Sequence, residues 1–151
     1  RLTNLAICHP PYFTLYRYSR VNSLELAWLG YDHRAVRESE IREAFKSGDA
    51  TKLNAYLDDL TLALENLATV IKPNGVLALM IGDKILKGRY LTVTARLLSR
   101  LTPSPYEIEK IALRIPKYTE ASWAASQRRN GDEVGVSLCD YVVVLRRGTY
   151  E

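Results

Sequence analysis

Apolar residues follow two patterns along this chain of 151 residues. Continuous apolar runs at residues 5–8 and 76–81 are typical of strands that are buried in a sheet. Between these runs, leucines recur every three or four positions, which predicts a helix that packs its apolar stripe on a sheet or on another helix. The stripe comprises Leu53, Leu57, Leu60, Leu64, Leu67 and Ile71, followed by Lys72 at the helix end and by the turn Pro73-Asn74-Gly75.

Two more helices are predicted between the first strand and the leucine stripe. Ser23 as N-cap and Gly30 as stop residue delimit a short helix at residues 24–29, in which we expect Trp28 to be buried. Residues 34–46 are charged with a sparse apolar face, and they are typical of a helix that lies at the surface.

The last third of the chain contains one helix and two strands. A helix is expected at residues 90–101, with one apolar face that comprises Leu91, Ala95, Leu98 and Leu101. Strands are predicted at residues 106–115 and 136–146, with a polar loop at residues 117–135 between them. Since strands and helices alternate, we expect an α/β fold with a mainly parallel sheet. The last two strands lack a helical connection, so they are expected to form an antiparallel hairpin at the sheet edge.

Composition narrows the class of protein only moderately. Hydrophobic residues make up 47% and charged residues 25%, which is ordinary for a single globular domain. The net charge of +4 is compatible with a nucleic-acid partner. No apolar stretch approaches the roughly 18 residues of a membrane span, and no signal peptide is recognisable. Cys8 and Cys139 both lie in apolar runs, which favours a reducing, cytoplasmic location, and the sequence offers too few ligands for a zinc site.

The segment that indicates chemistry follows the first predicted strand. There His9-Pro10-Pro11-Tyr12 ends the strand, because consecutive prolines cannot continue a sheet ladder. The segment resembles the catalytic motif of S-adenosylmethionine-dependent amino-group methyltransferases, in which a polar residue precedes two prolines and an aromatic residue. In that family the motif lies at the carboxyl end of the fourth strand of a seven-stranded Rossmann-like sheet, the edge where open α/β sheets bind ligands.

Further segments extend the resemblance over most of the chain. Residues 66–81 look like the helix, Lys-Pro-x-Gly turn and strand of the methyltransferase fold, and residues 138–145 look like its closing antiparallel strand. The Tyr- and Arg-rich loop and Leu-Glu-Leu-Ala-Trp-Leu-Gly that follow Pro-Pro-Tyr resemble a group of bacterial DNA modification methylases, which restriction–modification systems use. The resemblance implies a single, partial catalytic domain at residues 1–151, equivalent to the second half of the methyltransferase sheet.

The resemblance assigns a role to each residue of the motif. An exocyclic amino group of adenine or cytosine is a poor nucleophile, because its lone pair is delocalised into the ring. His9 and the backbone carbonyl of Pro10 would accept hydrogen bonds from the amino group, and the rigid Pro10-Pro11 pair would hold that carbonyl in place. Tyr12 would stack on the base after it leaves the duplex.

The loop that follows offers residues for substrate contact. Phe13, Tyr16 and Tyr18 are candidates to line a base pocket, and Arg20 is a candidate to bind phosphate. For Tyr16 and Tyr18 packing beneath the loop is an equal alternative, and for Arg20 solvent exposure is.

Two features depart from the family pattern. The family has Asp, Asn or Ser at the position of His9; a neutral imidazole can accept a hydrogen bond there, whereas a protonated one cannot. The sequence also lacks a glycine-rich strand-to-helix turn for the cofactor, since Gly82 and Gly88 are isolated. We therefore expect an upstream segment or a partner chain to supply the S-adenosylmethionine site.

The interpretation favoured by the sequence is methyl transfer to adenine N6 or cytosine N4 in DNA. Two alternatives stay open. One is methylation of RNA or of a protein glutamine, because an amide nitrogen poses the same chemical problem. The other is a non-catalytic, methyltransferase-like subunit that binds nucleic acid. No metal is expected in either case.

Overall fold

The computed structural model describes residues 2–13, 18–41, 50–86, 89–114 and 140–149. Its centre is a four-stranded sheet with the strand order β1-β2-β6-β5. The strands are β1 (Thr3–Cys8), β2 (Ile71–Gly82), β5 (Tyr106–Arg114) and β6 (Asp140–Arg147). The predicted strands are thus confirmed within the described residues, while Val136 and the loop at residues 117–135 lie outside them.

The sheet is mixed, and its predicted mainly parallel character is not confirmed. β1 and β2 pair in parallel, whereas β6 pairs antiparallel with both β2 and β5. The strands β1, β2 and β5 therefore run in one direction, and helices lie in the connections between them. β5 and β6 form the predicted antiparallel pair at one edge of the sheet, and β6 lies between β2 and β5, so that two of the three ladders are antiparallel.

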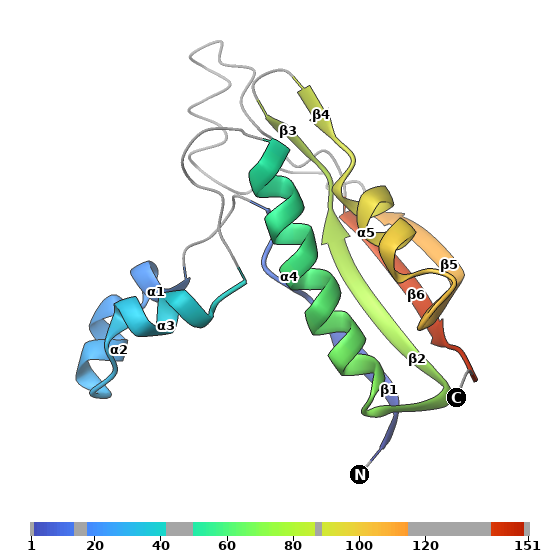
Figure 1. Ribbon diagram of the computed structural model, residues 1–151, viewed down its shortest axis with the longest axis horizontal. Helices are drawn as coiled ribbons and strands as arrows, with labels where there is room; N and C mark the ends of the chain where they lie inside the picture. Colours follow the sequence, from blue (N-terminus) through green and yellow to red (C-terminus); the bar gives the residue numbers. More distant parts are fainter. Residues whose placement is uncertain (1, 14–17, 42–49, 87–88, 115–139, 150–151) are drawn as a thin grey trace.

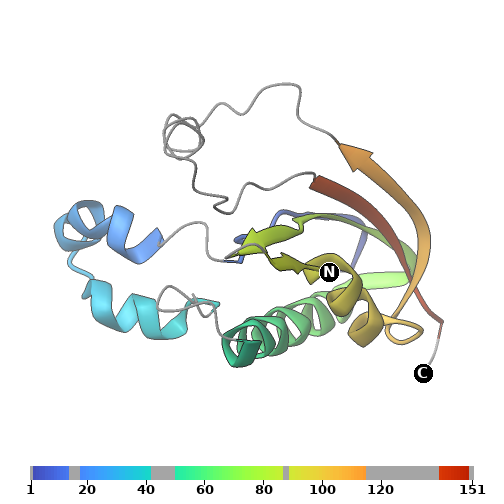
Figure 2. The ribbon, with the colours of Figure 1, turned by 90° about the horizontal axis from the view of Figure 1, so that it is seen from above.

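Two helices cover one face of this sheet (Figures 1 and 2). Helix α4 (Ala50–Ala68) connects β1 to β2, and helix α5 (Val93–Leu101) connects β2 to β5. The buried side chains of β2 and β6 lie on the same face of the sheet, because paired residues of neighbouring strands share a face. This face packs against the two helices. This core comprises Leu53, Tyr56, Leu57, Leu60, Leu64, Leu77, Leu79, Ile81, Val93, Leu97, Leu101, Tyr106, Val143 and Leu145, among others.

The leucine stripe of α4 is confirmed except at its end. The members of the stripe from Leu53 to Leu64 are at most 1% exposed, but the helix ends at Ala68 and Ile71 is the first residue of β2. Within β2 the register jumps from the pair Thr3–Ile71 to the pair Leu5–Val76. Residues 72–75 therefore form a bulge inside the strand rather than a turn after the helix.

Gly75 is required for this bulge. A Cβ atom there would lie 2.6 Å from Cγ2 of Ile71 and 2.8 Å from the carbonyl oxygen of Lys72. The preceding Asn74 has a positive φ of 61°, which asparagine tolerates better than most residues. The Pro-Asn-Gly segment, which the sequence predicts to be a turn after the helix, is instead part of this bulge.

The helix predicted at residues 90–101 begins later. Tyr90 and Leu91 belong to β4 (Arg89–Leu91), which pairs with β3 (Lys84–Leu86) in a small antiparallel sheet. Helix α5 then buries Val93, Thr94, Leu97, Leu98 and Leu101, whereas the predicted core residue Ala95 is exposed. The buried face of α5 is therefore displaced from the predicted one, and the helix starts at Val93.

Three short helices form an arm beside the sheet (Figure 1). They are α1 (Tyr18–Val21), α2 (Ser23–Trp28) and α3 (His33–Ser39). The N-cap of α2 is Asn22 rather than the predicted Ser23, and Gly30 follows the helix with a φ of 79°. Trp28 is 86% exposed, so its expected burial is wrong. We refer to α1–α3 as the helical arm; residues 42–46 of the predicted charged helix lie outside the described part.

The second face of the sheet is apolar but open. Leu5 and Ile7 of β1 are 52% and 81% exposed, and they share this face with the half-buried Val76, Ala78 and Met80. Among the described residues no helix covers this face. The strand β2 therefore has the apolar sequence of a strand covered on both sides, although the described elements cover only one side.

Candidate active site

The predicted catalytic segment lies at the carboxyl edge of the parallel strands. β1 ends at Cys8 and β2 ends at Gly82, so His9 and Asp83 both emerge at this edge. The antiparallel strand β6 begins there too, because its first residue Asp140 pairs with Gly82. Ligands of open α/β sheets bind at such an edge. The structure thus assembles the polar ends of three strands around residues 9–12.

The diproline corner, which we define as residues 9–12, is anchored to helix α4. The Tyr56 hydroxyl donates a hydrogen bond of 2.7 Å to the carbonyl oxygen of Pro11. Tyr56 is 2% exposed, and proline rings fix the backbone φ angles on the other side of this contact. Pro10 is buried, and within the described residues no hydrogen bond reaches its carbonyl oxygen.

The Tyr12 side chain reaches across the end of β2. Its hydroxyl donates a hydrogen bond of 3.0 Å to Oδ1 of Asp140, although β2 lies between β1 and β6 in the sheet. Oδ2 of Asp140 forms an ion pair of 3.3 Å with Arg114, the last residue of β5. The Tyr12 ring packs edge-on against the exposed His9 ring, with centroids 5.2 Å apart and an interplanar angle of 72°. This network connects the corner to the closing hairpin.

Burial raises the pKa of the two tyrosines at the corner. It raises the pKa of Tyr12, and the hydrogen bond to Asp140 raises it further. Burial also raises the pKa of Tyr56, with a smaller contribution from the neighbouring Tyr12 and Cys8. Both tyrosines are therefore neutral donors around pH 7. The pKa of Cys8 is raised by burial, so its thiol is not activated as a nucleophile.

The predicted substrate-binding residues have different positions. Phe13 is 3% exposed and packs on Tyr56 with ring centroids 5.3 Å apart, which supports a role in the core rather than in substrate contact. Tyr18 and Arg20 are exposed on α1 of the helical arm. Tyr16 lies outside the described residues. The structure thus groups His9, Pro10, Pro11 and Tyr12, but it does not add these candidates to them.

A second tyrosine–aspartate pair lies beside the corner and was missed by the sequence analysis. Asp83 is buried, and it accepts hydrogen bonds of 2.7 Å from the Tyr90 hydroxyl and from the Thr94 backbone N–H. The Tyr90 hydroxyl also lies 3.5 Å from that of Tyr141. Asp83 thereby caps α5 from the end of β2 and fixes the hairpin of β3 and β4. Its position directly after a buried strand was the available signal.

In the described part of the chain, β1 leads into the diproline corner and β2 leads into the β3–β4 hairpin. Neither of these two strands is followed there by a glycine-rich turn into a helix. We assign no residue to the cofactor.

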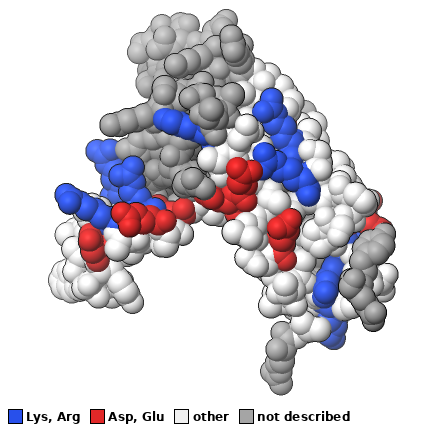
Figure 3. Space-filling view, viewed as in Figure 1, with Lys and Arg blue, Asp and Glu red and all other residues white. Residues whose placement is uncertain are grey.

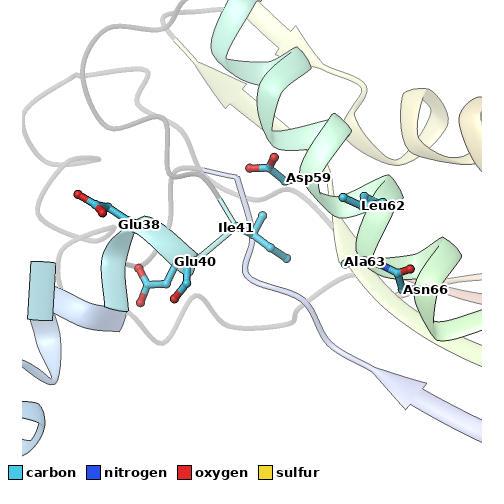
Figure 4. Close-up of a pocket in the computed structure, with 8 residues that line it drawn as sticks. Glu38, Glu40, Ile41, Asp59, Leu62, Ala63 and Asn66 are labelled. Carbon is cyan, nitrogen blue, oxygen red and sulfur yellow. The ribbon is translucent and has the colours of Figure 1, made fainter. Parts of the chain in front are cut away.

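Charged side chains are mixed on the face shown in Figure 3, where Lys and Arg on the helical arm alternate with acidic residues. A cavity of about 610 Å³ lies between α3 and α4 and is lined by Glu38, Glu40 and Asp59 as well as apolar side chains (Figure 4). Three carboxyl groups make this cavity unsuited to a phosphate backbone. It does not include the diproline corner.

The described residues contain no group of three or more His, Cys, Asp or Glu side chains arranged to hold a metal ion. None of the described helices has both the length and the apolar character needed to span a membrane.

The arrangement of strands and helices is found in solved structures of DNA methyltransferases. One is a proposed DNA modification methylase from Thermus thermophilus complexed with S-adenosyl-L-methionine, with a TM-score of 0.55 and 16% identity over 98% of this chain and 48% of that chain. Another is the cytosine-N4-specific PvuII DNA methyltransferase, with a TM-score of 0.57 and 12% identity over 94% of this chain and 41% of that chain.

These similarities show the fold of the chain, which is that of part of each of these proteins. The chain spans less than half the length of either protein. No protein-family model and no curated protein matches the sequence.

Proposed function

We propose that this chain is the substrate-orienting part of an S-adenosylmethionine-dependent DNA methyltransferase that acts on the exocyclic amino group of adenine or cytosine. The observation that carries the proposal is the position of residues 9–12 at the carboxyl edge of β1, with the Pro11 carbonyl held by Tyr56. The similarity in fold to DNA methyltransferases supports the same reaction class.

The residues of the corner would act by orienting the base. The imidazole of His9 and the carbonyl of Pro10 would each accept one N–H of the amino group, which favours a pyramidal nitrogen that can attack a methyl donor. Because prolines and Tyr56 hold the corner rigid, little reorganisation is required during the reaction. The ring of Tyr12 would stack on the extruded base. S-adenosylmethionine would supply the methyl group.

The proposal is tested by transfer of tritium from labelled S-adenosylmethionine to DNA, with tRNA and protein as parallel substrates. We expect label in DNA and its loss in the Pro10→Ala and His9→Ala variants. Label in tRNA or protein but not in DNA would replace the proposed substrate by one of the alternatives. Digestion of labelled DNA to nucleosides identifies the base that is modified.

A non-catalytic role is the second candidate, and the absence of a cofactor turn in the described part of the chain favours it. In that case a partner chain or a further segment would supply the methyl donor site. Calorimetric titration of the full-length protein, together with any partner chain, with S-adenosylmethionine separates the two: heat of binding supports a catalytic unit, while no heat together with binding to DNA supports a DNA-binding subunit.

A further inference from the structure

The Asp140 carboxylate is the point at which the closing hairpin meets the diproline corner. Its side chain is 15% exposed, and its two oxygens have different partners. Oδ1 accepts the hydroxyl of Tyr12 at 3.0 Å, and Oδ2 pairs with Arg114 at 3.3 Å. Both oxygens of this carboxylate therefore have partners within the site.

We propose that Asp140 is a positioning residue, which fixes the ring of Tyr12 in the orientation for stacking before the base arrives. The proposal rests on the proposed function and assigns Arg114 a supporting role, because its guanidinium orients the carboxylate. Asp140 itself would not contact the reacting atoms.

The geometry holds Tyr12 at both ends. Its backbone follows two prolines, and the second of them is bound through its carbonyl to Tyr56 on α4. The far end of its side chain is bound to Asp140 on β6. A phenylalanine at this position would have the same stacking surface but only the first attachment. An aromatic ring that is already fixed loses less conformational entropy when a base stacks on it.

The His9 ring makes this orientation functionally relevant. It contacts the Tyr12 ring edge-on at a centroid distance of 5.2 Å, so rotation of Tyr12 would also displace the proposed amino-group acceptor. The hydrogen bond to Asp140 thus fixes two groups of the corner, although its partner is 128 residues away in the sequence.

A double-mutant cycle on methyl transfer by the full protein tests this assignment. We expect Tyr12→Phe and Asp140→Asn each to lower kcat about tenfold, as loss of orienting contacts does, with a smaller effect on the KM for DNA. In the Tyr12→Phe background, Asp140→Asn should have no further effect, because the hydroxyl through which it acts is absent. Multiplicative effects of the two substitutions, or an unchanged kcat in Asp140→Asn, would overturn the proposal.

Glu109→Gln is the matched control on the same hairpin. Glu109 pairs with Arg146 at 2.7 Å through exposed side chains and does not contact the Tyr12–Asp140–Arg114 network. The control should transfer methyl groups at the rate of the unmodified protein. A tenfold loss in Glu109→Gln would attribute the Asp140 effect to the hairpin as a whole and contradict the assignment.

A readout that does not depend on catalysis separates this inference from the proposed function. Fluorine NMR of protein labelled with 3-fluorotyrosine, with the Tyr12 resonance assigned from Tyr12→Phe, reports the mobility of the ring. Asp140→Asn should shift and narrow this resonance, whereas Glu109→Gln should not. An unaltered resonance in Asp140→Asn overturns the positioning role. An unmodified protein that transfers no methyl group contradicts the proposed function alone.

Discussion

The Tyr56 hydroxyl and the Pro11 carbonyl form a hydrogen bond of 2.7 Å that joins the main core helix to the diproline corner. Tyr56 is buried on α4, so this donor has a fixed position relative to the sheet. The contact engages the Pro11 carbonyl within the protein. A residue of the core thereby influences the geometry of the proposed site.

Replacement of Tyr56 by phenylalanine should therefore affect both stability and activity. Removing the hydroxyl leaves the Pro11 carbonyl without its donor, and we expect a loss of about 1–2 kcal/mol in the free energy of unfolding. Methyl transfer should fall as well. Tyr106→Phe is the control, because its buried hydroxyl donates to the Leu64 carbonyl away from the corner. Urea denaturation should show similar losses for both variants, and equal activity losses would argue against a specific role of Tyr56.

Substitutions of His9 test the acceptor at the corner. Because His9 is exposed, His9→Ala should leave the free energy of unfolding within about 0.5 kcal/mol of its original value. It should lower kcat roughly 100-fold if the imidazole accepts the amino N–H. His9→Asn provides a neutral acceptor, so it should retain activity, including at acidic pH where a protonated imidazole cannot accept. Equal activity of all three proteins would remove His9 from the mechanism.

Alkaline conditions should destabilise the fold through buried tyrosines. Burial raises the pKa of Tyr106 from its ordinary value of 10 to about 12, with a smaller contribution from Cys8 and an opposing one from Arg147. The unfolded state thus loses this proton at lower pH than the folded state, so the contribution to stability is complete below pH 10 and decreases as the pH rises through 12. Urea denaturation at several pH values should show a smaller decrease for Tyr106→Phe than for the unmodified protein.

The core stripe of α4 can be tested by two leucines on opposite sides of the helix. Leu57→Ala removes a side chain that is 0% exposed and should cost about 2–5 kcal/mol. Leu62 is 60% exposed, and Leu62→Ala should change the free energy of unfolding by less than about 0.5 kcal/mol. Comparable losses for both would contradict the packing of α4 described above.

Local patterns predict most elements and the antiparallel pairing of the last two strands, but not the order of the strands in the sheet. Residues 5–8 and 106–115 are predicted to be strands because apolar runs and prolines are visible within a few residues. The insertion of β6 between β2 and β5 was not predicted, since it depends on contacts between residues far apart in the chain. Ile71 continues the spacing of the leucine stripe, but the helix ends at Ala68 and Ile71 begins β2.

In the candidate site, too, the local segment was predicted from the sequence and its distant partners were not. The segment His9–Tyr12 was identified from four consecutive residues, whose chemistry is local. Tyr56 and Asp140 were missed because they lie 45 and 128 residues from their partners in the corner. The partner of a polar residue at the start of a strand cannot be predicted until the order of the strands is known.

The insertion of β6 also affects how the protein is made. Its residues 140–147 are synthesised after those of all other strands, yet they separate β2 from β5 in the finished sheet. On the ribosome, the edges of β2 and β5 that pair with β6 therefore stay unpaired until β6 has emerged, and they are accessible to chaperones for that time. The described sheet is consequently complete only after β6 has been synthesised.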